Sequence, residues 1–318
     1  MEDKLILICS DVSEASTDVV CSWLAYYGKK FVRISSNNVI TIKRIIIDEK
    51  NEDILFSIDN LEYMLSDFKS YWYRRSHLKF ADFKSVEFNY EVLDLSCEVS
   101  SFLKKEYSKV IEYFVYKLDE LAVLNKFDDN NINKLRVLSL AKCLNLKIPS
   151  SNILDDLKVL DLTDKRYVTK AISDFMIKKD GKVFYSMTQK VNCEDGENMF
   201  YSLVQEEITK KFEIRSFFFN NYFYSSAIFS QENEKTSLDF RNYDHENPNR
   251  VVPFKLPNFI EEKLLQLCKI LELKSGSFDL AYTKNGDYVL FEVNPVGQFE
   301  QVSDPCNYNI HKEIALSL

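Results

Sequence analysis

Glycine and proline are scarce in this sequence, which contains six of each among its 318 residues. This composition predicts regular secondary structure with few long linkers. We find no internal repeat, and 46% of the residues are hydrophobic, which suffices for a large core. The length predicts two or three domains.

Histidine is rare and cysteine is scattered. The three histidines, His77, His245 and His311, lie far apart in the sequence, which argues against a metal site built on histidine. The cysteines contain no Cys-x-x-Cys pair: Cys9, Cys21, Cys97, Cys143, Cys193, Cys268 and Cys306. Such spacing argues against a disulfide framework or a zinc site and is typical of reduced thiols. We therefore expect a cytoplasmic protein.

Long hydrophobic runs and an excess of positive charge are also missing. No apolar stretch approaches the ~18 residues needed to span a membrane. The N-terminus, MEDKLILICSDVSEAST, begins with acidic residues and lacks the basic start and long apolar core of a signal peptide. The net charge of -8 gives no reason to expect nucleic-acid binding. We expect neither a membrane nor a nucleic acid as a partner.

The first part of the chain has the pattern of an α/β domain. A strand over residues 5–9, a helix over 18–28 and a second strand over 29–35 are expected from the apolar periodicity. Short strands follow in TIKRIIID and ILFSID. A long amphipathic helix over 97–125 closes this domain, for which we predict the bounds 1–125.

The remaining sequence predicts two further domains. A polar break precedes a helical pattern over 131–151, and strand-like runs dominate from VLDL at residue 159 onward, with one more helix over 258–273. We expect a small central domain over 126–200 and a C-terminal antiparallel α+β domain over 201–318.

Polar residues interrupt one apolar hairpin near the C-terminus. The segment FDLAYTKNGDYVLFEVN has two strand-like runs around an Asn-Gly pair, a strong hairpin signal. If Asn-Gly forms a two-residue loop, Glu292 lies directly opposite Asp279. Asn294 then lies on the same face, one diagonal step away.

Two carboxylates and an amide on one face suit a cation. Like charges directly opposite each other destabilise a strand pair, whereas Mg²⁺ binds one or two carboxylates together with substrate phosphates. A solvated hairpin face is the alternative. Apolar neighbours favour an enclosed site instead: Phe278, Leu280, Leu290, Phe291 and Val293. We therefore predict a magnesium site on this hairpin.

The hairpin resembles the metal-binding hairpin of the ATP-grasp ligases, with Asp279 followed by Glu292-x-Asn294 ahead of Pro-x-Gly-Gln. Upstream, NKLRVLSLAKCLNLKIPSS resembles the opening helix of their central domain, RYVTKAI the strand with a phosphate-binding lysine, and VQEEITKKFEIRSFFF the hinge and following strand. More narrowly, WYRRS, LDFRNYD and EVNPVGQF together are similar to the graspetide ligases, the microviridin-type and grasp-with-spasm peptide maturases. The motifs cover residues 70–310. The resemblance implies a three-domain ATP-grasp fold of α/β and α+β class.

The resemblance also implies ATP and Mg²⁺ as cofactors. It assigns the metal to Asp279, Glu292 and Asn294. It assigns the nucleotide to Lys134 and Lys170 at the phosphates, Gln205, Glu206 and Ile208 at the purine edge, Glu213 at the ribose and Phe291 at the purine ring. The alternatives remain open: an exposed helix lysine at 134, a polar turn at the hinge and a core role for Phe291.

Two pairs of an acid and an arginine complete the predicted site. Glu213 and Arg215 share one strand face, and the resemblance places Arg215 beside the transferring phosphate. Asp239 and Arg241 match a D-x-R motif that faces the core peptide in the graspetide ligases. Arg241 would bind the substrate carboxylate or its acyl phosphate, and Asp239 would orient the attacking group or accept its proton. A plain salt bridge is the alternative for each pair.

The leading hypothesis from this resemblance is an ATP-dependent peptide macrocyclase. It would activate an Asp or Glu side chain of a precursor peptide as an acyl phosphate and close a ring with a Ser/Thr hydroxyl or a Lys amine. Its partner would be a precursor with leader and core segments, and we expect a homodimer. A ligase of the ribosomal-protein glutamate ligase type and an inactive peptide- or nucleotide-binding module are the alternatives.

Overall fold

The computed structural model describes most of the chain, and the description below is confined to those residues. They are 4–82, 96–127, 132–160, 165–173, 176–179, 182–185, 188–191, 200–233, 235–240, 242, 244 and 246–318. The chain divides into two compact units: Met1–Asp128 with Ile310–Leu318, and Asp129–Asn309. No helix in the described ranges is both long and apolar enough to cross a membrane.

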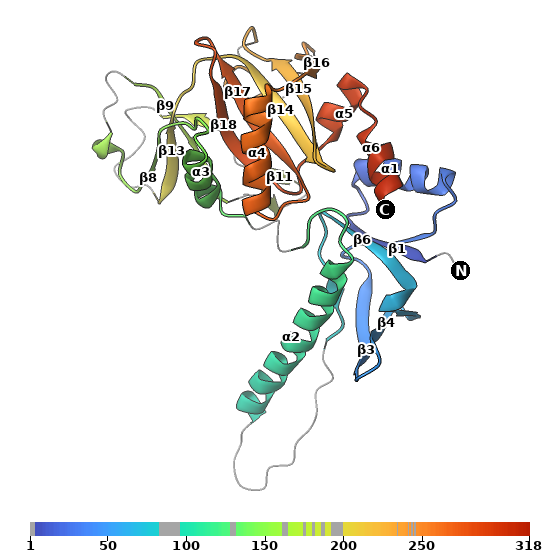
Figure 1. Cartoon of the computed structure of the whole chain (residues 1–318). Helices are drawn as coiled ribbons and strands as arrows, with labels where there is room; N and C mark the ends of the chain where they lie inside the picture. The colour runs from blue at the N-terminus through green and yellow to red at the C-terminus, as the bar shows by residue number, and fades with distance from the viewer. Residues whose placement is uncertain are drawn as a thin grey trace. The chain divides into compact units, whose positions relative to one another are not determined.

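The first unit is an α/β structure with two sheets (Figure 1). One sheet is parallel, in the order β2 (Phe31–Ile34), β1 (Leu5–Ser10) and β6 (Phe68–Arg74). The other has the order β5 (Leu61–Met64), β4 (Glu52–Ile58), β3 (Val39–Ile47) and β7 (Lys79–Phe80). Its helices are α1 (Ala15–Tyr26), the 3-10 helix η1 (Leu65–Asp67), α2 (Ser96–Glu120) and α6 (Ile310–Ser317). The predicted α/β opening and long amphipathic helix are confirmed.

The C-terminal segment completes this first unit. Helix α6 packs on α1, and the Lys29 ammonium donates to the carbonyls of Ala315 and Leu316, both at 2.9 Å. The buried hydroxyl of Ser70 on β6 donates to the carbonyl of Leu318 at 2.9 Å. Because a cation near the last carbonyls of a helix satisfies groups that have no partner within the helix, Lys29 stabilises the end of α6.

The arginines of the WYRRS motif differ from each other in environment. Arg74 is buried at the end of β6, where it pairs with Glu14 at 3.0 Å and donates to the Ser16 hydroxyl at 3.3 Å. Arg75 is exposed and has a φ of 49°. Arg74 therefore ties β6 to the start of α1, whereas the neighbouring Arg75 lies at the surface.

The second unit contains three sheets. The largest has the antiparallel order β16 (Arg250–Phe254), β15 (Tyr222–Phe229), β14 (Lys210–Phe219), β17 (Ser275–Thr283) and β18 (Tyr288–Asn294). A smaller sheet has the order β12 (Gln189–Lys190), β9 (Tyr167–Lys170), β13 (Ser202–Glu206) and β8 (Ser151–Leu154), and β10 (Met176–Lys179) pairs with β11 (Lys182–Tyr185). The helices are α3 (Lys134–Cys143), the 3-10 helix η3 (Leu157–Val159), α4 (Asn258–Ile270) and α5 (Glu300–Cys306).

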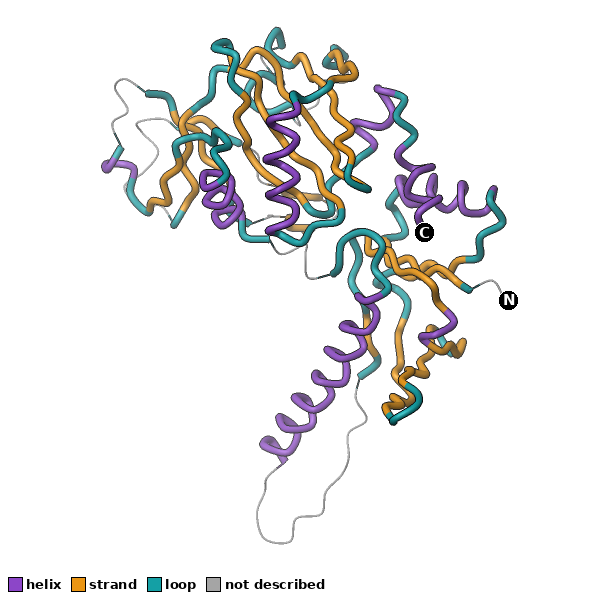
Figure 2. The backbone as a smooth tube through the Cα atoms, viewed as in Figure 1, coloured by secondary structure: helices purple, strands orange, loops and turns teal. Residues whose placement is uncertain are grey.

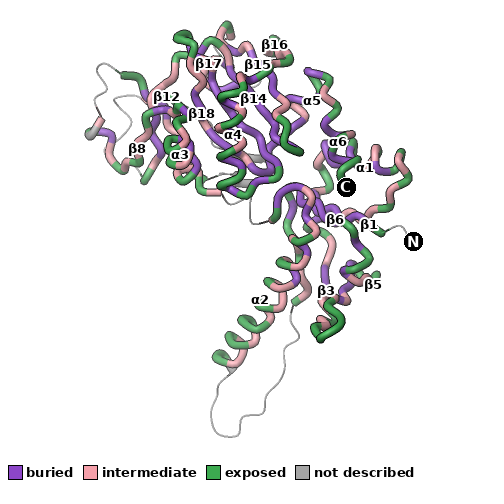
Figure 3. The backbone as a smooth tube through the Cα atoms, in the orientation of Figure 1, coloured by how far each residue is buried: buried purple, intermediate pink, exposed green. Residues whose placement is uncertain are grey.

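Helices α3 and α4 cover one face of the five-stranded sheet (Figure 2). Alternate strand residues such as Ile214, Phe278 and Leu280 point to this face, where they pack with Leu264 and Leu267 of α4. Burial of each such side chain contributes about 1.5–3 kcal/mol. The sheet is accordingly among the most buried parts of this unit (Figure 3). The strand period of two turns the intervening residues to the opposite face, which carries the polar groups described below.

One predicted strand of the second unit is wrong at its start. The VLDL segment was expected to begin a strand at Val159, but residues 157–159 form a 3-10 turn. Asp156 precedes this turn and its carboxylate accepts from the amide of Lys158 at 2.9 Å, which caps the turn. The end of VLDL lies outside the described residues. Strand structure instead begins earlier, with β8 (Ser151–Leu154).

Candidate active site

The β17–β18 hairpin brings two acids together, as predicted, but through a different loop. Asp279 lies directly opposite Glu292. The amide of Thr283 donates to the carbonyl of Asp287 at 2.9 Å, so the loop between them has three residues rather than the predicted two. Its last residue, Gly286, has a φ of 87°, a conformation that glycine adopts without steric cost.

A β-bulge at Phe291 restores the predicted pairing. Leu290 and Glu292 pair with successive residues of β17, and Phe291 between them adds one residue to β18. Leu290 and Val293 therefore belong to the core beneath the sheet, whereas Phe291 and Glu292 both face the opposite side. The two errors in the predicted geometry, one in the loop and one in the strand, cancel at Asp279.

Charged side chains form a row across the polar face of the sheet. Arg215 on β14 lies opposite Asp279 on β17, which lies opposite Glu292 on β18. The Arg215 guanidinium donates from Nη1 to Asp279 Oδ1. All three residues are buried, at 5–6% exposure. A buried row of this kind costs stability unless its charges are neutralised, so its presence indicates a function.

Two lysines from outside the sheet approach the same row. Lys134 begins α3, whose N-cap Asn133 accepts from two backbone amides, and its Nζ lies 3.9 Å from Glu292 Oε2. Lys170 at the end of β9 lies 3.7 Å from the same oxygen and donates to the Phe291 carbonyl at 3.4 Å. The predicted phosphate lysines and the predicted metal carboxylate thus lie together.

Asn294 completes the oxygen-rich end of the row. Its side-chain amide donates to Glu292 Oε1 at 3.0 Å, and β18 ends at this residue, as the following proline predicts. No group of three or more Asp, Glu, His or Cys suited to a metal occurs in the described residues. Two carboxylates and one amide fit Mg²⁺, which retains water or binds phosphate oxygens at its other positions. The donor set therefore fits this ion.

A close approach of backbone and side chain holds the loop after Asn294 in place. The amide of Gly297 donates to the Asn294 carbonyl at 3.0 Å, and the Ser277 hydroxyl donates to the Gln298 carbonyl at 3.1 Å. A Cβ at position 297 would overlap the side chain of Ser277 and lie 2.9 Å from the Asn294 carbonyl. Only glycine allows the loop to lie this close to the sheet.

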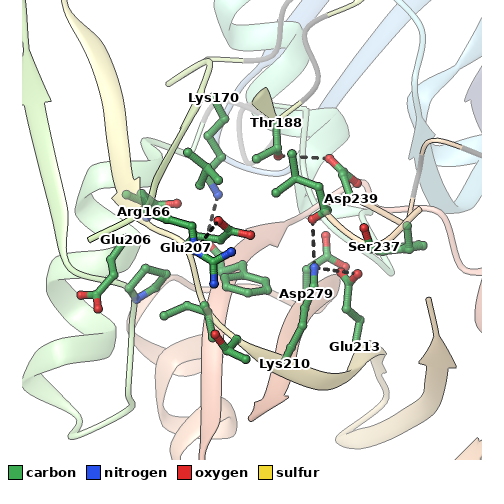
Figure 4. A pocket seen from close by; sticks show the side chains of 18 of the residues that line it. Arg166, Lys170, Thr188, Glu206, Glu207, Lys210, Glu213, Ser237, Asp239 and Asp279 are labelled. Atoms are coloured by element: carbon green, nitrogen blue, oxygen red, sulfur yellow. Dashed lines mark hydrogen bonds and ion pairs between the residues drawn. The ribbon is translucent and has the colours of Figure 1, made fainter. Parts of the chain in front are cut away.

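A cavity opens above the charged row (Figure 4). Nine predicted site residues line it: Lys170, Gln205, Glu206, Ile208, Glu213, Asp239, Asp279, Phe291 and Glu292. Arg215, Lys134 and Asn294 contact these residues from beside the cavity. Arg241 lies outside the described residues.

Glu213 lines the cavity with one anchored oxygen. Its Oε1 accepts from the Lys210 ammonium at 2.9 Å and from the Ser230 hydroxyl at 3.0 Å. Within the described residues, Oε2 receives no hydrogen bond. Burial raises the pKa of Glu213, and the nearby Asp239 charge raises it further, while Lys210 and Ser230 oppose this rise.

Lys210 is a cavity residue that the sequence does not reveal. It is buried and donates to the Leu238 carbonyl at 2.9 Å as well as to Glu213, and its ammonium lies 5.8 Å from the centre of the Phe291 ring. A bulge in β14 between Lys210 and Phe212 shifts the register. Lys210 and Glu213 therefore share a face, which three residues of regular strand would not allow.

Asp239 enters the cavity from the segment after β15. Its Oδ2 accepts from the Thr188 hydroxyl at 3.1 Å, and Asp239 is 8% exposed. The same segment provides Ser237 and Phe240 to the cavity wall. Since Lys210 holds the Leu238 carbonyl, the contact to Glu213 and the placement of Asp239 depend on one side chain.

The architecture and the polar face together define the ATP-grasp fold. No model of a known family matches the sequence, and no curated protein matches it.

Solved structures resemble the whole chain. One is a RiPP-associated ATP-grasp ligase of Chryseobacterium gregarium, in complex with ADP and a leader and core peptide. It is 19% identical, with 99% of this chain and 95% of that chain covered and a TM-score of 0.73. The macrocyclase MdnC of Microcystis aeruginosa, bound with precursor peptide MdnA, is 21% identical over 98% of each chain, with a TM-score of 0.72. D-alanyl-alanine synthetase A of Vibrio cholerae is 11% identical over 100% of this chain and 98% of that chain, with a TM-score of 0.52.

Proposed function

We propose that the protein is an ATP-dependent ligase that closes macrocycles in a ribosomally made precursor peptide. The observation that carries this proposal is the buried Asp279–Glu292 pair, which faces a cavity together with Lys134 and Lys170. Paired carboxylates with opposing lysines suit a metal-bound triphosphate, because phosphoryl transfer needs positioning and charge neutralisation. Similar folds that hold ADP and leader and core peptides support the choice of substrate.

In this proposal the nucleotide lies along the cavity. Asp279, Glu292 and Asn294 would hold Mg²⁺, which supplies charge neutralisation at the β- and γ-phosphates. Lys134 and Lys170 would bind the phosphates from the other side. The ribose hydroxyls would donate to Glu213 Oε2, since Oε1 is already bonded. Phe291 lies beside this carboxylate in the cavity wall, where its ring suits a purine face.

The base would lie at the hinge that follows β13. Gln205, Glu206 and Ile208 line that end of the cavity. Gln205 is buried, whereas Glu206 is partly exposed and lies 3.7 Å from the Lys165 ammonium. Gln205 is therefore the better candidate for a fixed contact to the purine edge.

Carboxylate activation would take place beside Arg215. An oxygen of the peptide Asp or Glu side chain attacks the γ-phosphorus, the bond to the β-phosphate oxygen breaks, and ADP leaves. The guanidinium of Arg215 suits the transferring phosphate because it pairs with Asp279, which lines the cavity, and a guanidinium fork matches phosphate oxygens. Asp279 accepts from Nη1 of that group and so orients it.

Ring closure would follow at the acyl phosphate. A Ser/Thr oxygen or Lys nitrogen of the peptide attacks the acyl carbon, and inorganic phosphate leaves with the electron pair of the broken carbon–oxygen bond. Asp239 would accept the proton of the attacking group, and Thr188 holds its carboxylate. Arg241 would bind the substrate carboxylate. We also propose a cytoplasmic homodimer and the division 1–125, 126–200 and 201–318 that the sequence predicts, except that residues 310–318 pack with the first part.

The proposal is tested by incubating the protein with ATP, Mg²⁺ and the precursor peptide encoded beside its gene. We expect ADP and phosphate to form, and the peptide to lose the mass of one water for each linkage. ATP turnover only with a free amino acid, with a gain of mass on the acceptor, would instead indicate a ligase of the glutamate-adding type. The absence of any ATP turnover with the peptide would contradict the proposed function.

A further inference from the structure

A short hydrogen-bond relay fixes the orientation of Gln205 at the hinge. Gln205 on β13 lies opposite Ser151 on β8, and its Nε2 donates to the Ser151 hydroxyl oxygen at 2.8 Å. That hydroxyl donates in turn to the Pro149 carbonyl at 2.8 Å. Both Pro149 and Gln205 line the cavity.

The relay has only one consistent direction. A carbonyl oxygen only accepts, so the single hydrogen of the Ser151 hydroxyl is committed to Pro149. The hydroxyl oxygen is then an acceptor towards Gln205, which must present Nε2 to it. Rotating the amide would place two acceptors, Oε1 and the Pro149 carbonyl, around one hydrogen and leave one unpaired.

This arrangement leaves Gln205 Oε1 as an acceptor at the cavity. Gln205 is 3% exposed, and its Oε1 accepts no hydrogen bond from any residue described in the structure. Arg166, a cationic residue of the cavity lining, faces Glu207 at 3.7 Å. A ligand group that meets Gln205 Oε1 must therefore donate a hydrogen bond.

We infer that Ser151 is a positioning residue that makes the site select a 6-amino purine over a 6-oxo purine. This inference rests on the proposed nucleotide site. The exocyclic amine of adenine donates to Gln205 Oε1, whereas the 6-oxo oxygen of hypoxanthine or guanine would face another acceptor. A buried polar group that must pair discriminates more strongly than an apolar wall does.

The experiment measures the dissociation constants of ATP and ITP, each with Mg²⁺, by isothermal titration calorimetry. ITP differs from ATP at the 6-position and carries no 2-amino group, so the ratio of the two constants reports on the contact to Gln205. The variants are Ser151→Ala, which frees the amide to rotate, and Ser151→Thr, which keeps the hydroxyl. Ser202→Ala is the control, because Ser202 lies on the same strand as Gln205 and its hydroxyl donates to the Phe200 carbonyl, and neither Ser202 nor Phe200 lines the cavity.

We expect the wild-type protein to bind ATP about tenfold more tightly than ITP, the ratio that one hydrogen bond provides. Ser151→Ala should lower this ratio about fivefold or more, mainly by improving ITP binding, since a rotated amide donates Nε2 to the 6-oxo oxygen. Ser151→Thr and Ser202→Ala should keep the wild-type ratio. An unchanged ratio in Ser151→Ala with normal ATP binding would overturn the inference alone. Failure of the wild-type protein to bind either nucleotide would overturn the proposed function as well.

Discussion

Replacing Lys210 with methionine should make stability depend on pH in a characteristic way. The substitution keeps the apolar stem but removes the ammonium that pairs with Glu213 at 2.9 Å and holds the Leu238 carbonyl at 2.9 Å. Loss of the bond to the carbonyl costs about 1 kcal/mol at any pH. Loss of the ion pair acts through Glu213. Burial raises the pKa of this carboxyl group, and the Lys210 charge lowers it in part.

The direction in which stability changes with pH follows from the linkage between proton binding and folding. An acid whose pKa is higher in the folded state lowers the free energy of unfolding as pH rises from its unfolded-state pKa to its folded-state pKa. Removing Lys210 raises the folded-state pKa of Glu213 further, so this loss continues to higher pH. Each pH unit above the unfolded-state pKa of Glu213 over which folding requires proton uptake costs about 1.4 kcal/mol. The total loss of stability through Glu213 is therefore at most about 4 kcal/mol at about pH 7.5. This limit agrees with the ~3–5 kcal/mol cost of breaking a buried ion pair.

The assay is thermal unfolding followed by circular dichroism between about pH 5 and about pH 8. Lys211→Met is the matched control, because Lys211 is adjacent and exposed. We expect Lys210→Met to unfold at a lower temperature than this control, and the difference in Tm to grow as pH rises. A difference in Tm of equal size across the pH range would refute the assigned effect of Lys210 on Glu213. The double variant with Glu213→Gln should lose most of the pH dependence.

Three further predictions concern the charged row and its surroundings. Glu292→Gln should reduce ATP turnover by about two orders of magnitude or more while the protein stays folded; near wild-type turnover would show that Glu292 does not hold the metal. Gly297→Ala should lower the free energy of unfolding by about 1–3 kcal/mol, measured by chemical denaturation. Adding Ser277→Gly should restore only part of this loss, because the new Cβ would still lie 2.9 Å from the Asn294 carbonyl. A fully stable Gly297→Ala would mean that the loop does not need glycine. Thr188→Val should raise the KM for the peptide roughly threefold or more at unchanged KM for ATP, because it removes the bond that orients Asp239; equal changes in both constants would point to a general distortion of the cavity.

Most residues that meet at the candidate site can be predicted from the sequence because their pattern is local. Two acids and an amide in one hairpin, with Lys170 on a strand and Glu213 and Arg215 two residues apart, are visible as residue types at strand spacing. Their close approach in the structure follows from antiparallel pairing, which links Arg215, Asp279 and Glu292 in one row.

Other features depend on irregularities that a periodic pattern does not contain. The bulge at Phe291 compensates for the three-residue loop, so the pairing of Asp279 with Glu292 was predicted through a wrong loop. The bulge in β14 turns Lys210 to the face of Glu213, and no spacing in the sequence indicates this. Ser151 acquires its role only because β8 lies beside β13 in the sheet.

Long-range packing also decides where the end of the chain belongs. The sequence predicts helical structure only by periodicity, and residues 310–318 form a short helix that joins the first unit through Lys29 and Ser70. These contacts link residues far apart in the sequence. The pattern of either segment alone does not reveal them.

In the proposed reaction, a peptide carboxylate is activated as an acyl phosphate in this cavity. This activation is tested most directly with a precursor peptide whose Asp and Glu side-chain carboxyl groups carry oxygen-18, incubated with the protein, ATP and Mg²⁺. We expect each linkage to transfer one labelled oxygen to inorganic phosphate, which mass spectrometry detects, and ADP to be the nucleotide product. Labelled AMP, or linkages formed with unlabelled phosphate, would contradict it.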